Sequence, residues 1–168
     1  MIRKKICVIG PSAVGKTSLI RRFVKGIFTD NYLTTIGVKI DNKIVPTDEG
    51  DVELLVWDIE GTDIFSDFNV RYIRGAAAII VVIDCNRKTS VFDALQLINS
   101  LESKHNAPCF LAINKCDLES QLAADDHKSL ALQGFKSTIS TSAKSGENVE
   151  SLFQEIGTLL VEQERAHG

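Results

Sequence analysis

A short stretch near the start of the chain, "GPSAVGKTS" at 10–18, has the residue types needed to hold phosphate groups. It matches G-x-x-x-x-G-K-[ST], in which glycines let the backbone curl so that its N–H groups point inward at phosphate oxygens. Lys16 would add a positive charge at the β- and γ-phosphates, and the Thr17 hydroxyl would bind Mg²⁺. The helix expected to start here directs the positive end of its dipole at the same anion. The predicted phosphate site consists of Ser12, Ala13, Val14, Gly15, Lys16, Thr17 and Ser18.

Two more polar motifs, "NKCD" at 114–117 and "SAK" at 142–144, each follow a predicted strand. A carboxylate at Asp117 can accept two hydrogen bonds, from an N1–H and a 2-amino group, and guanine offers that pair whereas adenine does not. A backbone N–H in "SAK" can reach a purine oxygen. Either motif alone is weak, because Asn and Asp commonly form turns. Together they predict guanine selectivity, since a ligand that leaves buried polar groups unpaired is rejected.

The elements that must position these motifs alternate between strands and helices. Apolar runs and helical spacing predict strands at 6–9, 37–46, 52–58, 78–84, 109–113 and 137–141, and helices at 19–27, 65–74, 91–101, 123–133 and 149–163. This order predicts an α/β fold with a mostly parallel six-stranded sheet, one antiparallel edge strand from a hairpin turning at 48–51, and helices on both faces. Ligands bind at the carboxyl ends of the strands in such sheets, where all three motifs lie.

Composition excludes several other classes of protein. A chain of 168 residues is expected to form one domain, residues 1–168, and a monomer. The net charge of −3 predicts no general attraction to nucleic acid, and the basic runs 3–5 and 21–22 are interpreted as solvated faces. The longest apolar run, 76–83, is too short to span a bilayer. The four cysteines form no C-x-x-C pair, which favours reduced thiols in a cytoplasmic protein.

The motifs "GPSAVGKTSLI", "TTIG", "WDIEG", "NKCD" and "SAK" occur in an order and at a spacing that resemble the Ras superfamily of small GTPases, over essentially the whole chain. Within that superfamily, "TIGV" at 35–38, Trp57 and "RYIRGAAAIIVVID" at 71–84 are most similar to the Rab branch. The resemblance implies that the chain binds GTP and GDP with Mg²⁺ and acts as a molecular switch in membrane traffic or signalling.

The same resemblance implies individual residue roles. Thr17 and Thr35 would bind Mg²⁺, and Asp58 would hold it through water; Thr34 is an alternative to Thr35 that fits the "TIG" register less well. Phe28 would pack against the guanine ring, with an ordinary core position as its alternative. The residues implied to complete the base pocket are Asn114, Lys115, Asp117, Ser142, Ala143 and Lys144.

The catalytic residues implied by the resemblance are Lys16, Thr35, Gly61 and Thr62. Gly61 would sense the γ-phosphate through its N–H. Thr62 stands where most relatives carry a glutamine that orients the attacking water, and threonine is too short to do so. Glu60 replaces a usual alanine and adds negative charge, so slow hydrolysis is expected. The alternatives are a GTP-binding scaffold with little hydrolysis, and a nucleotide kinase in which "NKCD" and "SAK" are coincidental.

The segments 30–40 and 59–73 are the expected switches, through which effectors, exchange factors and GTPase-activating proteins would act. Ile40 replaces a phenylalanine that is usual in the Rab effector-facing aromatic cluster, and this departure counts against a standard Rab effector. The sequence ends in "ERAHG" without the C-terminal cysteine of prenylated Rab proteins. Either the chain is truncated or it does not anchor in that way; the expected location is cytoplasmic, with peripheral membrane contact only through a lipidated tail.

Overall fold

The computed structural model describes residues 1–29, 37–59 and 67–167, and only the backbone of residues 67–69. The elements in chain order are β1 (Ile2–Ile9), α1 (Lys16–Lys25), β2 (Val38–Thr47), β3 (Gly50–Ile59), α2 (Asp67–Ile73), β4 (Ala78–Asp84), α3 (Thr89–Leu101), β5 (Cys109–Asn114), α4 (Ala124–Ala131), β6 (Ser137–Ser140) and α5 (Val149–His167). Of the helices in the described part of the chain, none has the length and apolarity to cross a membrane.

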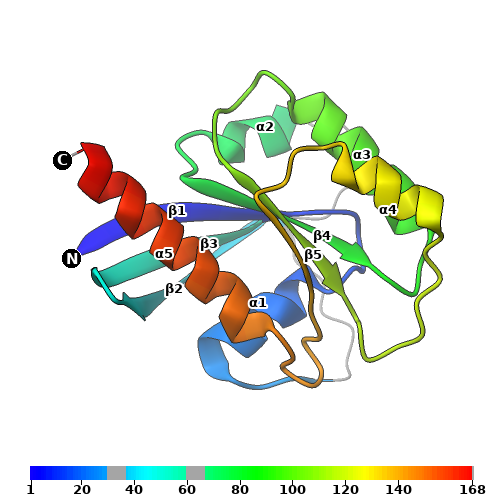
Figure 1. The fold of residues 1–168 in the computed structure, drawn as a ribbon, viewed down its shortest axis with the longest axis horizontal. Helices are drawn as coiled ribbons and strands as arrows, with labels where there is room; N and C mark the ends of the chain where they lie inside the picture. The colour runs from blue at the N-terminus through cyan, green and yellow to red at the C-terminus, as the bar shows by residue number, and fades with distance from the viewer. Residues whose placement is uncertain (30–36, 60–66, 168) are drawn as a thin grey trace.

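The strands form one six-stranded sheet in the order β2-β3-β1-β4-β5-β6 (Figure 1). All neighbouring pairs are parallel except β2 and β3, which form the antiparallel hairpin at one edge. The predicted α/β fold is therefore confirmed, including its single antiparallel edge strand. In this topology β1 lies at the centre of the sheet, so the loop that follows it emerges in the middle of the carboxyl edge.

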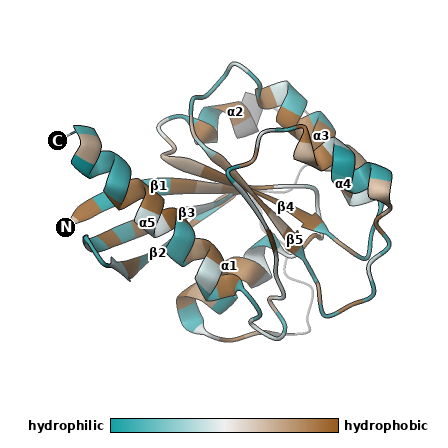
Figure 2. Cartoon of the chain, viewed as in Figure 1, coloured by the Kyte–Doolittle hydropathy of each residue, from teal (hydrophilic) through white to brown (hydrophobic). Residues whose placement is uncertain are grey.

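Helices cover both faces of the sheet. One core cluster joins the sheet to α1 and α5, with members such as Phe23 and Phe153, and a second cluster joins it to α2, α3 and α4, with members such as Leu97 and Leu130. Every residue of β4 is buried between these two layers. Hydrophobic residues are concentrated in the strands, whereas α4 is largely hydrophilic and α5 alternates along its length (Figure 2).

Several predicted boundaries shift because pairing partners extend or end an element. β1 begins at Ile2 rather than residue 6, because Ile2–Lys5 pair in parallel with Val52–Leu55 of β3. The hairpin turn is shorter than 48–51, since Thr47 pairs with Gly50. At the far end of the chain, α5 continues four residues past the predicted 163, to His167.

The prediction that Ile27 belongs to the first helix is wrong. α1 ends at Lys25, and Gly26 follows in a left-handed conformation with φ of 69°, its N–H donating to the carbonyl of Arg22. Glycine adopts this conformation without the strain that a side chain would bring, and it commonly ends helices in this way. Ile27 is consequently 45% exposed instead of buried on the helix face.

The four cysteines are all free thiols, as expected; Cys7 and Cys85 are buried, and Cys109 and Cys116 are partly exposed. Burial raises the pKa of the Cys7 thiol to about 11, so it stays protonated at neutral pH.

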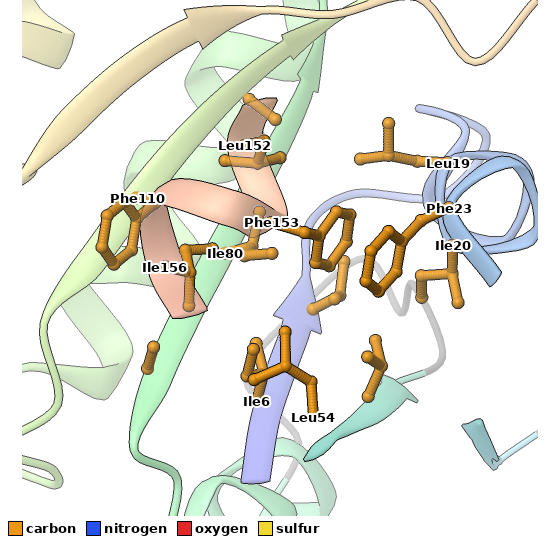
Figure 3. Close-up of a cluster of buried hydrophobic side chains, with 14 of the residues drawn as sticks. Ile6, Leu19, Ile20, Phe23, Leu54, Ile80, Phe110, Leu152, Phe153 and Ile156 are labelled. Carbon is orange, nitrogen blue, oxygen red and sulfur yellow. The ribbon is translucent and has the colours of Figure 1, made fainter. Parts of the chain in front are cut away.

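The helix that follows the phosphate motif is held in place mainly by an aromatic pair. Phe23 of α1 stacks on Phe153 of α5 with ring centroids 3.8 Å apart and an angle of 6° between the rings (Figure 3). Both rings are almost fully buried, at 1% and 0% exposed. Large buried aromatic side chains contribute several kcal/mol to a core of this kind. The pair therefore packs α1 against α5, and with α1 the last residues of the predicted phosphate motif, from Lys16 on.

We expect Phe153→Ala to lower the free energy of unfolding by about 3–5 kcal/mol, because it leaves a cavity beneath Phe23. Chemical denaturation of the protein, with saturating GDP and without it, measures this loss. Phe92→Ala is the matched control: Phe92 is 62% exposed on α3, and its removal should change stability by less than about 0.5 kcal/mol. Equal losses in the two variants would contradict the importance of the stacked pair.

Candidate nucleotide-binding site

The three polar motifs meet at the carboxyl edge of the sheet, through a single buried amide. Asn114 is the last residue of β5 and is 1% exposed. Its Nδ2 donates to the carbonyl oxygen of Val14 at 3.0 Å, and its Oδ1 accepts from Thr141 Oγ1 at 3.1 Å. The side chain thus joins the phosphate motif, "NKCD" and the segment that leads into "SAK". The structure brings these motifs together as expected, while their roles toward a nucleotide remain predictions.

The ammonium group of Lys16 lies inside the phosphate loop. Lys16 is 6% exposed, and its Nζ donates to the carbonyl oxygens of Gly10 at 3.0 Å and Pro11 at 2.9 Å. Burial lowers the pKa of Lys16 to about 8, an effect that the Asp58 carboxylate opposes and that the Arg87 guanidinium adds to. A phosphate anion placed here would favour the charged form of Lys16, because an opposite charge nearby raises the pKa of an amine.

Lys115, predicted for the base pocket, directs its ammonium group at the phosphate loop. Its Nζ donates to the carbonyl oxygen of Ala13 at 3.0 Å and pairs with Asp84 Oδ2 at 3.0 Å. Asp84 ends β4, so this contact ties two neighbouring strand ends to the loop. Ala13 itself has a φ of 64°, a left-handed conformation that is strained for any residue other than glycine.

Two oxygen groups predicted to hold Mg²⁺ lie side by side. Thr17 Oγ1 donates to Asp58 Oδ2 at 2.6 Å, and Asp58 is 1% exposed near the end of β3. The described residues contain no group of three or more His, Cys, Asp and Glu side chains able to hold a metal. A hydroxyl beside one carboxylate fits Mg²⁺, which usually takes one or two protein oxygens together with water and phosphate oxygens. The donor set therefore suits this ion when a phosphate is present.

The carboxylate predicted to recognise guanine is oriented by a buried hydroxyl. Ser142, which is 0% exposed, donates from Oγ to Asp117 Oδ1 at 2.7 Å and accepts at the same oxygen from the N–H of Ser145 at 3.0 Å. Asp117 is exposed at the surface, as a side chain that meets a ligand must be. Ser142 therefore orients the carboxylate that is predicted to recognise the base, a contact that the sequence did not indicate.

The interpretation of Arg22 as part of a solvated basic face is wrong. From α1, its Nε donates to the carbonyl of Ala143 at 2.8 Å, and its Nη2 donates to the carbonyl of Lys144. Arg22 thus holds the backbone of "SAK", where the N–H groups expected to reach the base are located. Phe28, half-buried after α1, packs against the adjacent core cluster, which is compatible with either role considered for it.

Several predicted site residues lie outside the described part of the chain. These are Thr35 with its alternative Thr34, and Glu60, Gly61 and Thr62. The expected switches, 30–40 and 59–73, are described only at residues 37–40, 59 and 67–73. Among the predicted catalytic residues, Lys16 lies in the described part of the chain and Thr35, Gly61 and Thr62 do not.

A central parallel sheet whose first loop is a curled G-x-x-x-x-G-K-T segment defines a P-loop nucleotide-binding protein. The sequence pattern of the Ras family matches residues 5–162. The chain is 31% identical to the Ras-related protein SEC4 of Candida albicans over 163 residues, which covers 95% of this chain and 78% of that protein. It is 33% identical to the human Ras-related protein Rab-31 over 156 residues, covering 90% and 80%, and 39% identical to the Ras-related protein Rab-1 of Theileria parva over 164 residues, covering 93% and 73%. The chain belongs to the Ras family and is a Rab-like small GTPase.

Gly15 is required by the close approach of Asn114. Its φ is 95°, and a Cβ atom placed there would lie 2.5 Å from Asn114 Nδ2. Any side chain at this position must displace the amide that joins the three motifs, because contacts under about 3 Å do not occur between such atoms. The glycine is therefore a condition for the site's central hydrogen bond.

We expect Gly15→Ala to lower GDP affinity about tenfold or more, since the displaced amide leaves buried polar groups unpaired. Isothermal titration with GDP and Mg²⁺ measures the change. Gly134→Ala is the control, because Gly134 has a comparable φ of 76° but no atom within 4 Å of the added Cβ. A similar loss of GDP affinity in both variants would mean that backbone strain, and not the contact with Asn114, is responsible.

Proposed function

We propose that this chain is a guanine-nucleotide switch that binds GTP and GDP with Mg²⁺ and hydrolyses GTP slowly. The observation that carries the proposal is the hydrogen-bonded link from the phosphate loop through Asn114 to the segment holding Asp117 and Ser142. A phosphate site and a carboxylate suited to guanine are thereby held at a fixed separation on one rigid edge. A site for phosphate alone, or a kinase with coincidental motifs, gives no reason for this connection.

The chain's own residues supply most of what binding and hydrolysis require. The backbone of 12–18 offers N–H groups to phosphate oxygens, and Lys16 adds a buried positive charge where negative charge develops in the transition state. Mg²⁺, held through Thr17, Asp58 and Thr35, would neutralise charge on the β- and γ-phosphate oxygens. Gly61 is proposed to sense the γ-phosphate, and Thr62 is proposed to leave the attacking water poorly oriented.

Partners are proposed to bind the surface next to the switches. Ile40 of β2 is 51% exposed and pairs in register with Trp57 of β3. The Trp57 and Tyr72 rings have centroids 6.0 Å apart, and Lys5 Nζ lies 3.8 Å from the Trp57 ring. This surface, together with 30–40 and 59–73, would engage effectors, exchange factors and GTPase-activating proteins. The similarity of the chain to Rab proteins supports a role in membrane traffic. Contact with a membrane would be through a lipidated tail if one follows residue 168.

The second candidate function is a GTP-binding scaffold that hydrolyses little or no GTP. The observation that favours it is the pair of departures at Glu60 and Thr62 from the residues usual in the family. The intact phosphate and metal residues favour the switch. A single-turnover hydrolysis assay with Mg²⁺ separates the two.

We expect Asp117→Asn to shift nucleotide preference from GTP toward xanthosine triphosphate. The 2-oxo group of xanthine needs a hydrogen-bond donor where guanine needs an acceptor, and Ser142 would still hold the new side chain in place. Competition titration with the two nucleotides measures the shift. Unchanged GTP affinity in the variant would remove Asp117 from the base pocket.

We expect intrinsic GTP hydrolysis at or below about 10⁻⁴ per second, the order for unassisted Ras-type enzymes. Thr62→Gln should raise the rate because the longer amide can orient water, and adding Glu60→Ala should raise it further by removing a negative charge. GTP affinity should stay nearly constant, since the phosphate and metal residues are unchanged. Single-turnover rates of the wild type, both single variants and the double variant decide the matter. A fast wild type, or a Thr62→Gln variant that is no faster, would contradict the proposed cause of slow turnover.

A further inference from the structure

The turn between β4 and α3 places an arginine against the phosphate loop. Arg87 Nη2 donates to the carbonyl oxygen of Ser12 at 2.5 Å. The backbone of Arg87 is fixed in turn: its N–H donates to Asp84 O at 3.1 Å, and its carbonyl accepts from the Ser90 hydroxyl at 2.7 Å. Ser90 is 0% exposed, so the turn that presents Arg87 is anchored in the protein interior.

This contact completes a series along the phosphate loop. The carbonyls of Gly10 and Pro11 accept from Lys16, that of Ala13 from Lys115, and that of Val14 from Asn114. The Ser12 carbonyl lies between them in the chain and is held by Arg87. Five successive carbonyls of the loop are therefore each held by a side chain from outside it or from the start of α1.

Holding a carbonyl also directs the next N–H. The peptide unit is planar and trans, so the N–H of Ala13 points opposite to the C=O of Ser12. Because Arg87 holds that carbonyl from the turn between β4 and α3, the Ala13 N–H is directed away from that turn. Ala13 needs such a restraint, because its φ of 64° is strained for alanine and a rotation of the peptide would relieve it.

The positive charge of Arg87 also lies next to the loop. Arg87 and Lys16 both donate to carbonyls of this loop, and two positive charges near one loop favour an anion there.

We propose that Arg87 is a positioning residue of the nucleotide site, which holds the Ser12 carbonyl outward so that the Ala13 N–H faces the phosphates. The inference rests on the proposed function, since it concerns the same site. Arg87 does not contact the nucleotide in this proposal; it acts through the backbone of Ser12 and Ala13.

The main test compares GDP release from Arg87→Ala and from Lys88→Ala, measured with a fluorescent GDP analogue and Mg²⁺. Lys88 is the adjacent basic residue, and its Nζ pairs with Asp126 of α4 at 3.2 Å instead of with the phosphate loop. We expect Arg87→Ala to release GDP about tenfold faster, as for the loss of one hydrogen bond from a charged donor. Lys88→Ala should release it at the wild-type rate. Equal rates in the two variants would overturn the proposal.

A second measurement separates positioning from a general effect on the fold. The ³¹P resonances of bound GDP should shift in Arg87→Ala and stay unchanged in Lys88→Ala, because only the first variant frees the peptide next to the phosphates. Arg87→Lys, which keeps the charge and one donor, should recover part of the slow release. Faster release with unmoved phosphate resonances would show that Arg87 only stabilises the turn, and would overturn the proposal. If the alanine variant does not fold, Arg87→Gln takes its place in both comparisons.

Nucleotide binding by the wild-type protein distinguishes a failure of the proposed function from a failure of the inference about Arg87. If it binds no guanine nucleotide, the proposed function fails, and this inference fails with it. If it binds GDP and Arg87→Ala behaves as wild type, the inference alone fails.

Discussion

A loop that binds anions through its own backbone must keep its carbonyl oxygens away from the anion, and this constraint shapes the whole site. Backbone N–H and C=O groups alternate along a chain, so a run of inward N–H groups requires partners for the carbonyls on the other side. For the carbonyls of Ser12, Ala13 and Val14 those partners are the side chains of Arg87, Lys115 and Asn114. The carbonyls of Gly10 and Pro11 accept instead from Lys16, whose ammonium group lies inside the loop. Asn114 ends β5, Lys115 follows it, and Arg87 lies in the turn between β4 and α3, which is why the loop depends on the sheet that surrounds it.

Asn114 connects the segment predicted to bind phosphate to the segments predicted to bind the base. Its amide donates to the phosphate loop and accepts from Thr141, which leads into the segment held by Ser142 and Arg22. Because these bonds are buried, loosening one end leaves polar groups unpaired at the other. The two halves of the site are therefore coupled through Asn114 and also through Lys115, and a ligand that satisfies both halves also stabilises the contacts between them.

The packing of the core determines how rigid the carboxyl edge of the sheet is. α1 carries Lys16 and Thr17 at its start and is fixed by the stacked rings of Phe23 and Phe153 beneath it. The central strand β4 has no exposed residue, since it is buried between two helical layers. Lys16 and Thr17, two of the predicted site residues, are thus carried on a firmly packed part of the molecule, as precise positioning requires.

The sequence by itself determined the order of strands and helices, the antiparallel edge and the composition of the phosphate and base motifs, because apolar periodicity and local motifs are properties of neighbouring residues. It also placed Asn114, Asp117 and Thr17 at strand ends or a helix start, where the structure has them. It did not reveal that β1 begins at Ile2, since those residues are ordered by pairing with β3. Nor did it indicate Arg22, Arg87 or the hydroxyl of Ser142, whose partners are 121, 75 and 25 positions away in the chain. Only the tertiary structure decides such contacts, because no local pattern records which side chain a distant carbonyl or carboxylate will meet.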